Sequence, residues 1–209
     1  MLSFDTEMIF RIPALLLALT VHEYAHAATA DSLGDPTPKY MGRLTMNPLK
    51  HLDPVGTIML LFAGFGWAKP VAVNPSYFRD GKRDMMAVSF AGPGSNFLLA
   101  FIGIVLIAIF RMSGFGNPGV YAFLFWLQLY NVWFALFNLI PIPPLDGSKI
   151  LMSLLPGRYA YELMKLEQYS FILMIVLVFS GAVGIVLRPL AQIILGSMNF
   201  VVYSIFSLF

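Results

Sequence analysis

The chain has 209 residues, of which 58% are hydrophobic and only 11% are charged, whereas soluble domains carry about a quarter charged residues. This composition excludes an ordinary soluble domain and predicts a protein of the lipid bilayer. The 13 basic and 11 acidic residues are too evenly balanced to indicate nucleic-acid binding. Because the chain contains no cysteine, a transition metal would need His, Asp or Glu ligands.

The first predicted transmembrane helix covers residues 4–30 and ends before Gly34-Asp35-Pro36, where a glycine and a proline favour a helix stop. It lacks the basic start and the small-residue cleavage site of a signal peptide, so we expect it to remain in the mature protein. Within it stands the sequence His22-Glu23-Tyr24-Ala25-His26. Residues four apart share one helix face, so both imidazoles can bind one zinc ion, and Glu23 beside them can activate water.

The alternative is a chance pair of histidines on a solvated helix face. We disfavour it because the preceding residues, from Ile12 to Val21, are almost all apolar. Ionisable groups inside a membrane are costly unless they are paired or functional. The pattern therefore favours zinc-dependent hydrolysis with Glu23 as the general base.

Residues 55–67 are apolar but too short for an ordinary span, which needs about 20 residues. If they do not cross, the seven Lys and Arg residues between positions 31 and 84 lie on one side, as the positive-inside rule favours for the cytoplasm. We therefore expect residues 55–73 to enter the membrane as a re-entrant hairpin or short helix. A complete crossing by residues 55–67 is the alternative.

Four further spans are predicted. They cover residues 85–111, residues 120 to about 140, residues 169–187 and residues 189–209, and the last two are separated by Arg188-Pro189. The predicted fold is an all-α polytopic membrane protein with about five transmembrane helices plus the re-entrant hairpin or short helix. We expect one membrane-embedded domain over residues 1–209, with a catalytic core at about residues 4–150 and C-terminal helices at about residues 169–209.

A catalytic zinc site commonly has three protein ligands and keeps a fourth position open. Asp146 is the best third candidate, because it follows a predicted span and a proline-rich turn. In the re-entrant topology it lies at the same cytoplasmic membrane depth as His22 and His26. Its alternative role is that of an N-cap for the following helix.

Three motifs together resemble the site-2 proteases: the His22-to-His26 pattern, Ala91-Gly92-Pro93-Gly94-Ser95-Asn96, and the stretch from Asn138 to Asp146-Gly147. The resemblance implies an intramembrane zinc metalloprotease with a three-helix catalytic core and an aspartate as third ligand. It also implies cleavage of transmembrane or membrane-proximal segments, often with release of a membrane-held regulator. The chain is similar to the compact prokaryotic branch of this family, whose members lie in the cell membrane and lack PDZ or CBS domains.

The resemblance further implies that Asn96 and Asn138 bind the substrate backbone or stabilise the oxyanion, and the alternative is interhelical hydrogen bonding. His51 is expected to order a loop rather than to touch the metal. Trp67 and Lys69 could edge a substrate cleft by strand addition, or Trp67 could be a plain interfacial anchor.

Two other functions fit a membrane protein with His, Asp and Glu. An ion transporter should spread such residues along a path, whereas here they gather at one depth. A scaffold with a structural zinc site should supply a fourth ligand, and no good one is found. The expected partners are therefore a transmembrane protein or peptide substrate and the lipid bilayer.

Overall fold

The computed structural model describes residues 6–63 and 66–207. Within these residues the chain is α-helical, and its β-structure is a single bridge between Leu52 and Ala68. The helices are α1 (Met8–Ser32), α2 (Thr37–Tyr40), α3 (Pro54–Ala63), α4 (Gly81–Ser113), α5 (Pro118–Asn138), α6 (Asp146–Leu154), α7 (Gly157–Lys165), α8 (Ser170–Phe179) and α9 (Ala182–Phe206). Short 3₁₀ turns lie at Pro48–Lys50, Pro75–Tyr77 and Leu166–Tyr169.

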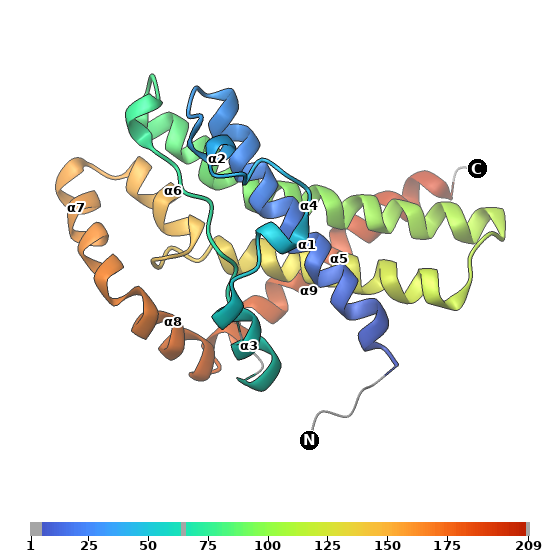
Figure 1. Ribbon diagram of the computed structural model, residues 1–209. Helices are drawn as coiled ribbons and strands as arrows, with labels where there is room; N and C mark the ends of the chain where they lie inside the picture. Colours follow the sequence, from blue (N-terminus) through green and yellow to red (C-terminus); the bar gives the residue numbers. More distant parts are fainter. Residues whose placement is uncertain (1–5, 64–65, 208–209) are drawn as a thin grey trace.

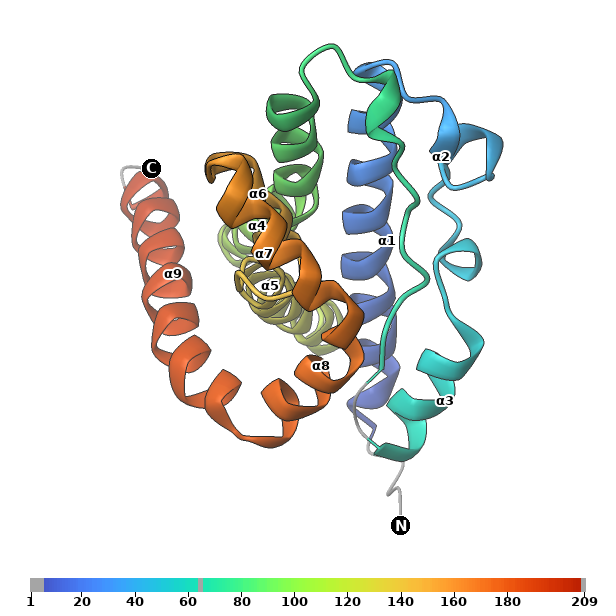
Figure 2. The same ribbon diagram turned by 90° about the vertical axis from the view of Figure 1, so that its left-hand side faces the viewer.

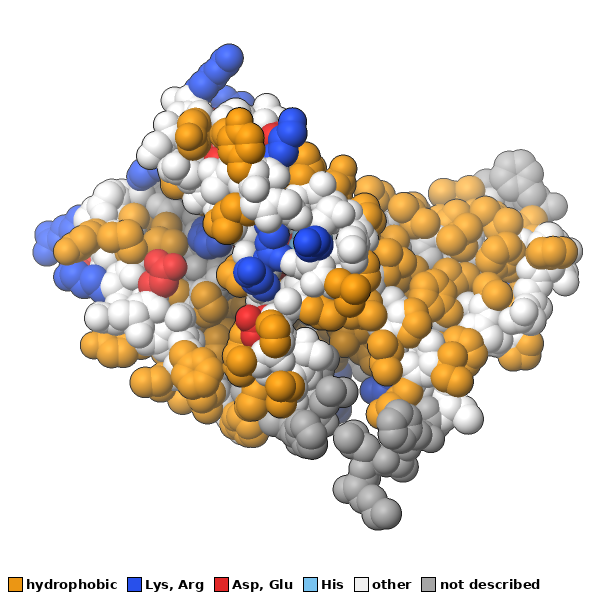
Figure 3. Space-filling view, in the orientation of Figure 1, with side chains coloured by type: hydrophobic (Ala, Val, Ile, Leu, Met, Phe, Trp, Pro, Cys, Tyr) orange, Lys and Arg blue, Asp and Glu red, His pale blue; other side chains and the backbone are white. Residues whose placement is uncertain are grey.

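Four helices in the described part of the chain, α1, α4, α5 and α9, are long and apolar enough to cross a membrane. On the face that Figure 3 shows, their outer surface carries many hydrophobic side chains and very few charged ones. The Lys and Arg side chains on that face gather mainly at the other end, over α2, α6 and α7 and the neighbouring loops. This confirms the predicted all-α polytopic membrane protein.

Helices α1, α4 and α5 pack closely along one another and form the three-helix centre of the bundle (Figure 1). Ala14 on α1 meets Ile107 on α4 and Leu124 and Leu127 on α5 in a common buried cluster. Small residues at such a contact let the helix backbones approach closely, which favours packing in a membrane. α9 covers the other side of α4 and α5, where Ala100, Val132 and Ala191 share a second cluster.

The two C-terminal helices divide at a different place from the one predicted. Arg188-Pro189 was expected to separate two spans, but Pro189 lies inside α9, and the break falls at Gly181, whose φ is 73°. Glycine adopts this left-handed conformation without steric cost. The helix continues through Pro189 because Leu187 and Ala191, on either side of it, are buried. α8 therefore has 10 residues, which is too short to cross a bilayer.

The chain turns back after α3, and the returning segment, residues 66–74, passes beside the residues that precede α3. Besides the Leu52–Ala68 bridge, the Lys69 N–H donates to the His51 carbonyl at 2.9 Å. α3 has only 10 residues, so its form agrees with the expected hairpin or short helix rather than with a crossing. Its depth in the membrane stays a prediction. Figure 2 shows α3 and the returning chain on one side of α1, with α6 to α8 on the other.

Candidate metal centre

Three donor atoms from two distant parts of the chain meet inside the bundle. His22 and His26 lie one turn apart on α1, and Asp146 is the first residue of α6. The two Nε2 atoms are 2.9 Å apart, and Asp146 Oδ2 lies 3.1 Å from His22 Nε2 and 3.2 Å from His26 Nε2. All three residues are buried. The helix spacing thus brings the imidazoles together as expected, and the fold brings the carboxylate to them.

The triangle of donor atoms fits a zinc ion. Zinc bonds of about 2.0–2.2 Å in a tetrahedral site place the ligand atoms roughly 3.3–3.5 Å apart. The observed triangle is smaller by a few tenths of an ångström, a difference that small rotations of the side chains can supply. The three residues can therefore hold zinc and leave a fourth corner for water or substrate.

Hydrogen bonds behind the histidines fix which nitrogen faces the centre. His26 Nδ1 lies 2.7 Å from the Val88 carbonyl of α4, which can only accept, so Nδ1 carries a proton and Nε2 is the nitrogen that can bind a metal. His22 Nδ1 lies 2.7 Å from Asn96 Oδ1. The Asn96 amide nitrogen donates to the Ala18 carbonyl at 2.9 Å and to Asn131 Oδ1 at 2.7 Å, so its oxygen points at His22. Such partners orient metal ligands and raise their basicity.

Asp146 stands just inside α6, after the proline-rich turn. Leu145 is the N-cap of that helix, and no side chain caps it, so the alternative role of Asp146 as an N-cap is not adopted. Burial by itself raises the pKa of Asp146. The charges and hydrogen bonds of His26 and His22 outweigh that effect and hold the pKa below its usual value. The carboxylate is therefore ionised, as a metal ligand requires.

Glu23 is buried beside the histidines and accepts a hydrogen bond from the Val71 N–H at 3.2 Å. It lines a cavity of about 360 Å³ together with His22, His26 and Asp146. Its lining also includes Trp67 and Phe171, whose ring centroids lie 6.2 Å apart. The three-helix centre, the returning segment, α6 and α8 thus all contribute to the lining of this cavity.

The two predicted asparagines occupy different places. Asn138, at the end of α5, lines the cavity, and its amide donates to the Phe134 carbonyl at 3.0 Å. Asn96 is fully buried behind His22, and its amide nitrogen is engaged by other helices. The Asn96 contacts with Ala18 of α1 and Asn131 of α5 are the interhelical hydrogen bonds of the alternative interpretation. A direct contact of either residue with substrate stays a prediction.

His51 lies apart from the donor triangle and orders a loop, as the sequence favoured. It is fully buried, and its Nε2 lies 2.8 Å from the Thr45 carbonyl. Trp67 lies in the cavity wall, and the neighbouring Lys69 is exposed.

Sequence reasoning missed two supports of the site. Asn131 is fully buried on α5 and holds Asn96; its signal was a polar residue in an apolar span, where such groups need partners. Gly92 was quoted as part of a motif without a role. A Cβ at this position would lie 2.6 Å from His22 Cε1, so any side chain there would push against the imidazoles.

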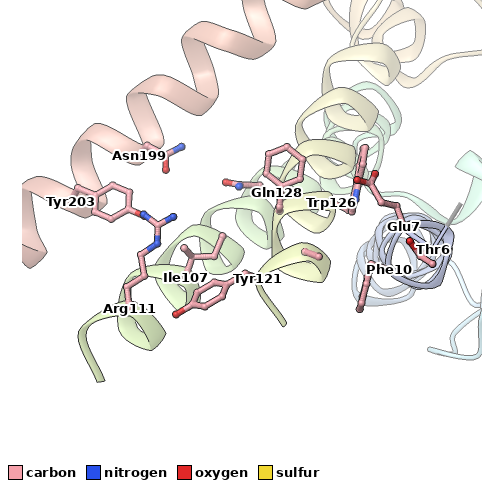
Figure 4. Close-up of a pocket in the computed structure, with 12 residues that line it drawn as sticks. Thr6, Glu7, Phe10, Ile107, Arg111, Tyr121, Trp126, Gln128, Asn199 and Tyr203 are labelled. Carbon is pink, nitrogen blue, oxygen red and sulfur yellow. The ribbon is translucent and has the colours of Figure 1, made fainter. Parts of the chain in front are cut away.

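A second cavity, of about 560 Å³, lies at the far end of the bundle (Figure 4). Glu7, Arg111, Gln128 and Asn199 lie in its wall, among several aromatic rings. Arg111 turns toward Tyr203, and its Nη1 donates to the phenol oxygen at 3.1 Å. About 12 residues of α1 separate Phe10, at this cavity, from His22, which corresponds to about 18 Å of helix.

The fold and the donor set together define the class of helical membrane metalloproteins. The model of peptidase family M50 matches residues 106–183 of the chain. "Putative zinc metalloprotease YwhC" of Bacillus subtilis is 42% identical over 189 residues, which cover 88% of this chain and 86% of that protein. "Putative zinc metalloprotease Rip2" of Mycolicibacterium smegmatis is 30% identical over 191 residues, which cover 88% of this chain and 71% of that protein.

A more distant relative is "Zinc metalloprotease MJ0392" of Methanocaldococcus jannaschii, which is 28% identical over 147 residues, or 70% of this chain and 34% of that protein. No solved structure matches the chain significantly. The chain therefore belongs to peptidase family M50, the site-2 proteases, and is a metalloprotease by family. The names of the relatives imply zinc as the metal.

Proposed function

We propose that this protein is a zinc-dependent endopeptidase that hydrolyses peptide bonds in transmembrane or membrane-proximal segments of membrane proteins. The observation that carries the proposal is the buried triangle of His22, His26 and Asp146, with Glu23 in the same cavity wall. His22, Glu23 and His26 lie on α1, which is long enough to span the bilayer. Asp146 lies on the short helix α6, which packs against the candidate span α4. A substrate must therefore reach the site at or near membrane depth.

In this proposal His22, His26 and Asp146 hold one zinc ion, which supplies Lewis acidity toward water and the scissile carbonyl when bound. The protonated Nδ1 atoms keep both imidazole Nε2 lone pairs turned to the centre. The carboxylate of Asp146 balances part of the metal charge in a buried place, where an unpaired charge would be costly.

Glu23 acts as the general base and then as the general acid. Its carboxylate takes a proton from the attacking water, and the same proton passes to the nitrogen of the departing amine. The Val71 N–H holds one carboxylate oxygen and leaves the other available for this transfer. Glu23 lines the same cavity as the three metal-binding residues, as this role requires.

Asn138 is the better placed of the two asparagines to meet a substrate, because it lines the cavity. We propose that its amide hydrogen-bonds the substrate backbone, whereas Asn96 orients His22. A helical substrate has its carbonyls in internal hydrogen bonds, so it must unwind before cleavage. Substrates with helix-breaking residues near the cut should therefore react faster.

The orientation follows from charge. Lys and Arg gather at the end of the molecule that carries α2, α6 and α7, and cytoplasmic loops are enriched in these residues. We propose that this end, with the metal centre near it, faces the cytoplasm of a prokaryotic cell. Cleavage there would release the cytoplasmic part of a membrane-held regulator.

The test compares wild type, Glu23→Gln and Asp146→Asn in lipid nanodiscs. Cleavage of fluorescent single-span peptides, with and without a helix-breaking pair, is measured beside zinc content. We expect zinc and cleavage in wild type, zinc without cleavage in Glu23→Gln, and weakened zinc binding in Asp146→Asn. A transporter or scaffold would be insensitive to Glu23→Gln, and undiminished cleavage by that variant would remove Glu23 from its role.

A further inference from the structure

One peptide group, between Pro70 and Val71, lies between a buried arginine and Glu23. Its N–H, on Val71, donates to Glu23 Oε2 at 3.2 Å. Its carbonyl, on Pro70, accepts a hydrogen bond from Arg43 Nη2 at 3.0 Å. Arg43 Nη2 also donates to the carbonyl of Lys69. A guanidinium and a carboxylate are thus joined through a single amide.

The surrounding chain leaves this peptide little freedom. The preceding N–H, on Lys69, is held by the His51 carbonyl, and Pro70 has no N–H. Further along, the Asn74 N–H donates to Asp35 Oδ2 at 2.7 Å. Hydrogen bonds therefore fix the returning segment on both sides of Val71. Between these two hydrogen bonds, the Val71 N–H donates to Glu23.

Arg43 is buried, unlike the other Lys and Arg residues between α2 and α4. It is only 4% exposed, and its Nε has no hydrogen-bond partner. Among the residues that the structure describes, no carboxylate lies within ion-pair distance of it. A buried charge without such a partner is costly. The two backbone carbonyls are the compensation that the structure offers, so the guanidinium is held tightly against them.

The chemistry of the amide makes this arrangement directional. A cation at the carbonyl oxygen polarises the peptide and makes its N–H a stronger donor. The Glu23 carboxylate then receives a charge-assisted hydrogen bond, a kind that is stronger than one between neutral groups. The result is a carboxylate kept in one orientation at the cavity wall, and such orientation is a large part of how enzymes lower barriers.

We propose that Arg43 is a positioning residue for the general base, and that it acts on Glu23 through the Pro70–Val71 peptide. The inference rests on the proposed function for its effect on catalysis, but the contact itself can be tested separately. Arg43 touches neither the donor triangle nor, by the described contacts, the cavity. Its removal should therefore lower kcat while zinc binding is kept and KM changes little.

The first measurement is kinetic and uses the full chain in nanodiscs. Arg43→Gln should lower kcat by about 10- to 100-fold, as loss of an orienting partner typically does. Arg43→Lys, which keeps the charge without the planar fork, should recover part of that loss. The matched control is Arg79→Gln, which removes a charge from an exposed arginine of the same long loop and should leave kcat and zinc content unchanged.

The second measurement does not need proteolysis. The chain contains two Pro–Val pairs, Pro54-Val55 and Pro70-Val71. Labelling with carbonyl-¹³C proline and ¹⁵N valine therefore gives two amide signals, and Val55→Ala identifies them by removing one. The Val71 amide proton should move upfield in both Arg43→Gln and Glu23→Gln, because the first variant loses the cation at the Pro70 carbonyl and the second loses the negative charge of the acceptor. The Val55 signal should stay in place.

The outcomes separate cleanly. If wild type cleaves no substrate, the proposed function fails, while the Val71 signal still decides whether Arg43 and Glu23 are connected. An unmoved Val71 signal in Arg43→Gln overturns the inference, and so does an unchanged kcat. Loss of zinc, or movement of both valine signals, would assign Arg43 a merely structural role and would also overturn it.

Discussion

The two ends of the bundle each have a cavity with polar groups, and of these two only one is lined by the metal-binding groups. The far cavity has a volume of about 560 Å³ and the cavity at the metal centre about 360 Å³. In the far cavity, Arg111 pairs with Tyr203 at the periphery. At the metal centre, three donor atoms point at one another and each histidine has a partner behind it.

Convergence of the donor atoms, rather than polarity alone, marks the candidate site. A polar group in a membrane protein is costly wherever it lies. At the far end the structure meets that cost with aromatic partners, as for Arg11, which lies 4.4 Å from the Trp126 ring centroid. At the metal centre the hydrogen bonds leave the Nε2 and Oδ2 atoms directed at one point. Substitutions at the two ends should therefore have very unequal effects.

The largest effect is expected for Glu23→Gln, which removes the proton acceptor and keeps the shape. Cleavage should fall by about 10²- to 10⁴-fold, the usual contribution of general acid–base catalysis, while zinc content measured by mass spectrometry stays at that of wild type. Cleavage reduced less than tenfold would show that another group moves the proton.

Gly92→Leu comes next, because its side chain would occupy the space of the two imidazoles. We expect zinc affinity to fall by at least about 100-fold, beyond the range seen for loss of an outer partner, as measured by competition with a zinc-binding dye. Gly196→Leu is the control, since a side chain there has open space. Equal zinc affinities of the two variants would contradict the tight packing at Gly92.

A matched pair of asparagines compares the two ends directly. Asn131→Leu leaves one Asn96 N–H without its acceptor, so His22 loses part of its support. We expect activity to fall by about 10- to 100-fold and stability to fall by about 1–3 kcal/mol. Asn199→Leu removes an asparagine from the wall of the far cavity and should leave activity near wild type. Similar losses of activity in both variants would abolish the distinction between the ends.

The smallest effect is expected for Arg111→Gln. Arg111 is exposed, and it contacts Tyr203 through one hydrogen bond and a ring whose centroid lies 5.9 Å away. Exposed contacts of this kind contribute about 0.5–1 kcal/mol. Thermal unfolding in detergent should therefore show a small loss of stability, with cleavage unchanged. A large loss of activity would give the far cavity a part in catalysis.

The sequence alone predicts those parts of the molecule that depend on local pattern. The helix period places His22 and His26 together, and the membrane setting makes that pair significant. The third ligand, Asp146, could be proposed because a proline-rich turn follows a recognisable span. The placement of Asp146 needs one further assumption, namely which helix ends lie at the same depth in the membrane.

The rest depends on contacts between distant or irregular segments. The bridge from Arg43 to Glu23 passes through a backbone amide, which no residue type reveals. The division at Gly181 rather than at Pro189 depends on burial of Leu187 and Ala191 against neighbouring helices. Tertiary packing therefore overrides a local helix-breaking signal there, since proline bends a packed helix more readily than it ends one.

X-ray absorption at the zinc edge of the Glu23→Gln protein tests most directly whether the three converging side chains hold the metal. We predict one zinc per chain, with two imidazole nitrogens and oxygen donors at about 2.0–2.2 Å, and loss of an oxygen donor or of the zinc itself in Asp146→Asn. A zinc ion whose spectrum is the same with and without the Asp146 carboxylate, or a purified protein that binds no zinc, would contradict the assignment.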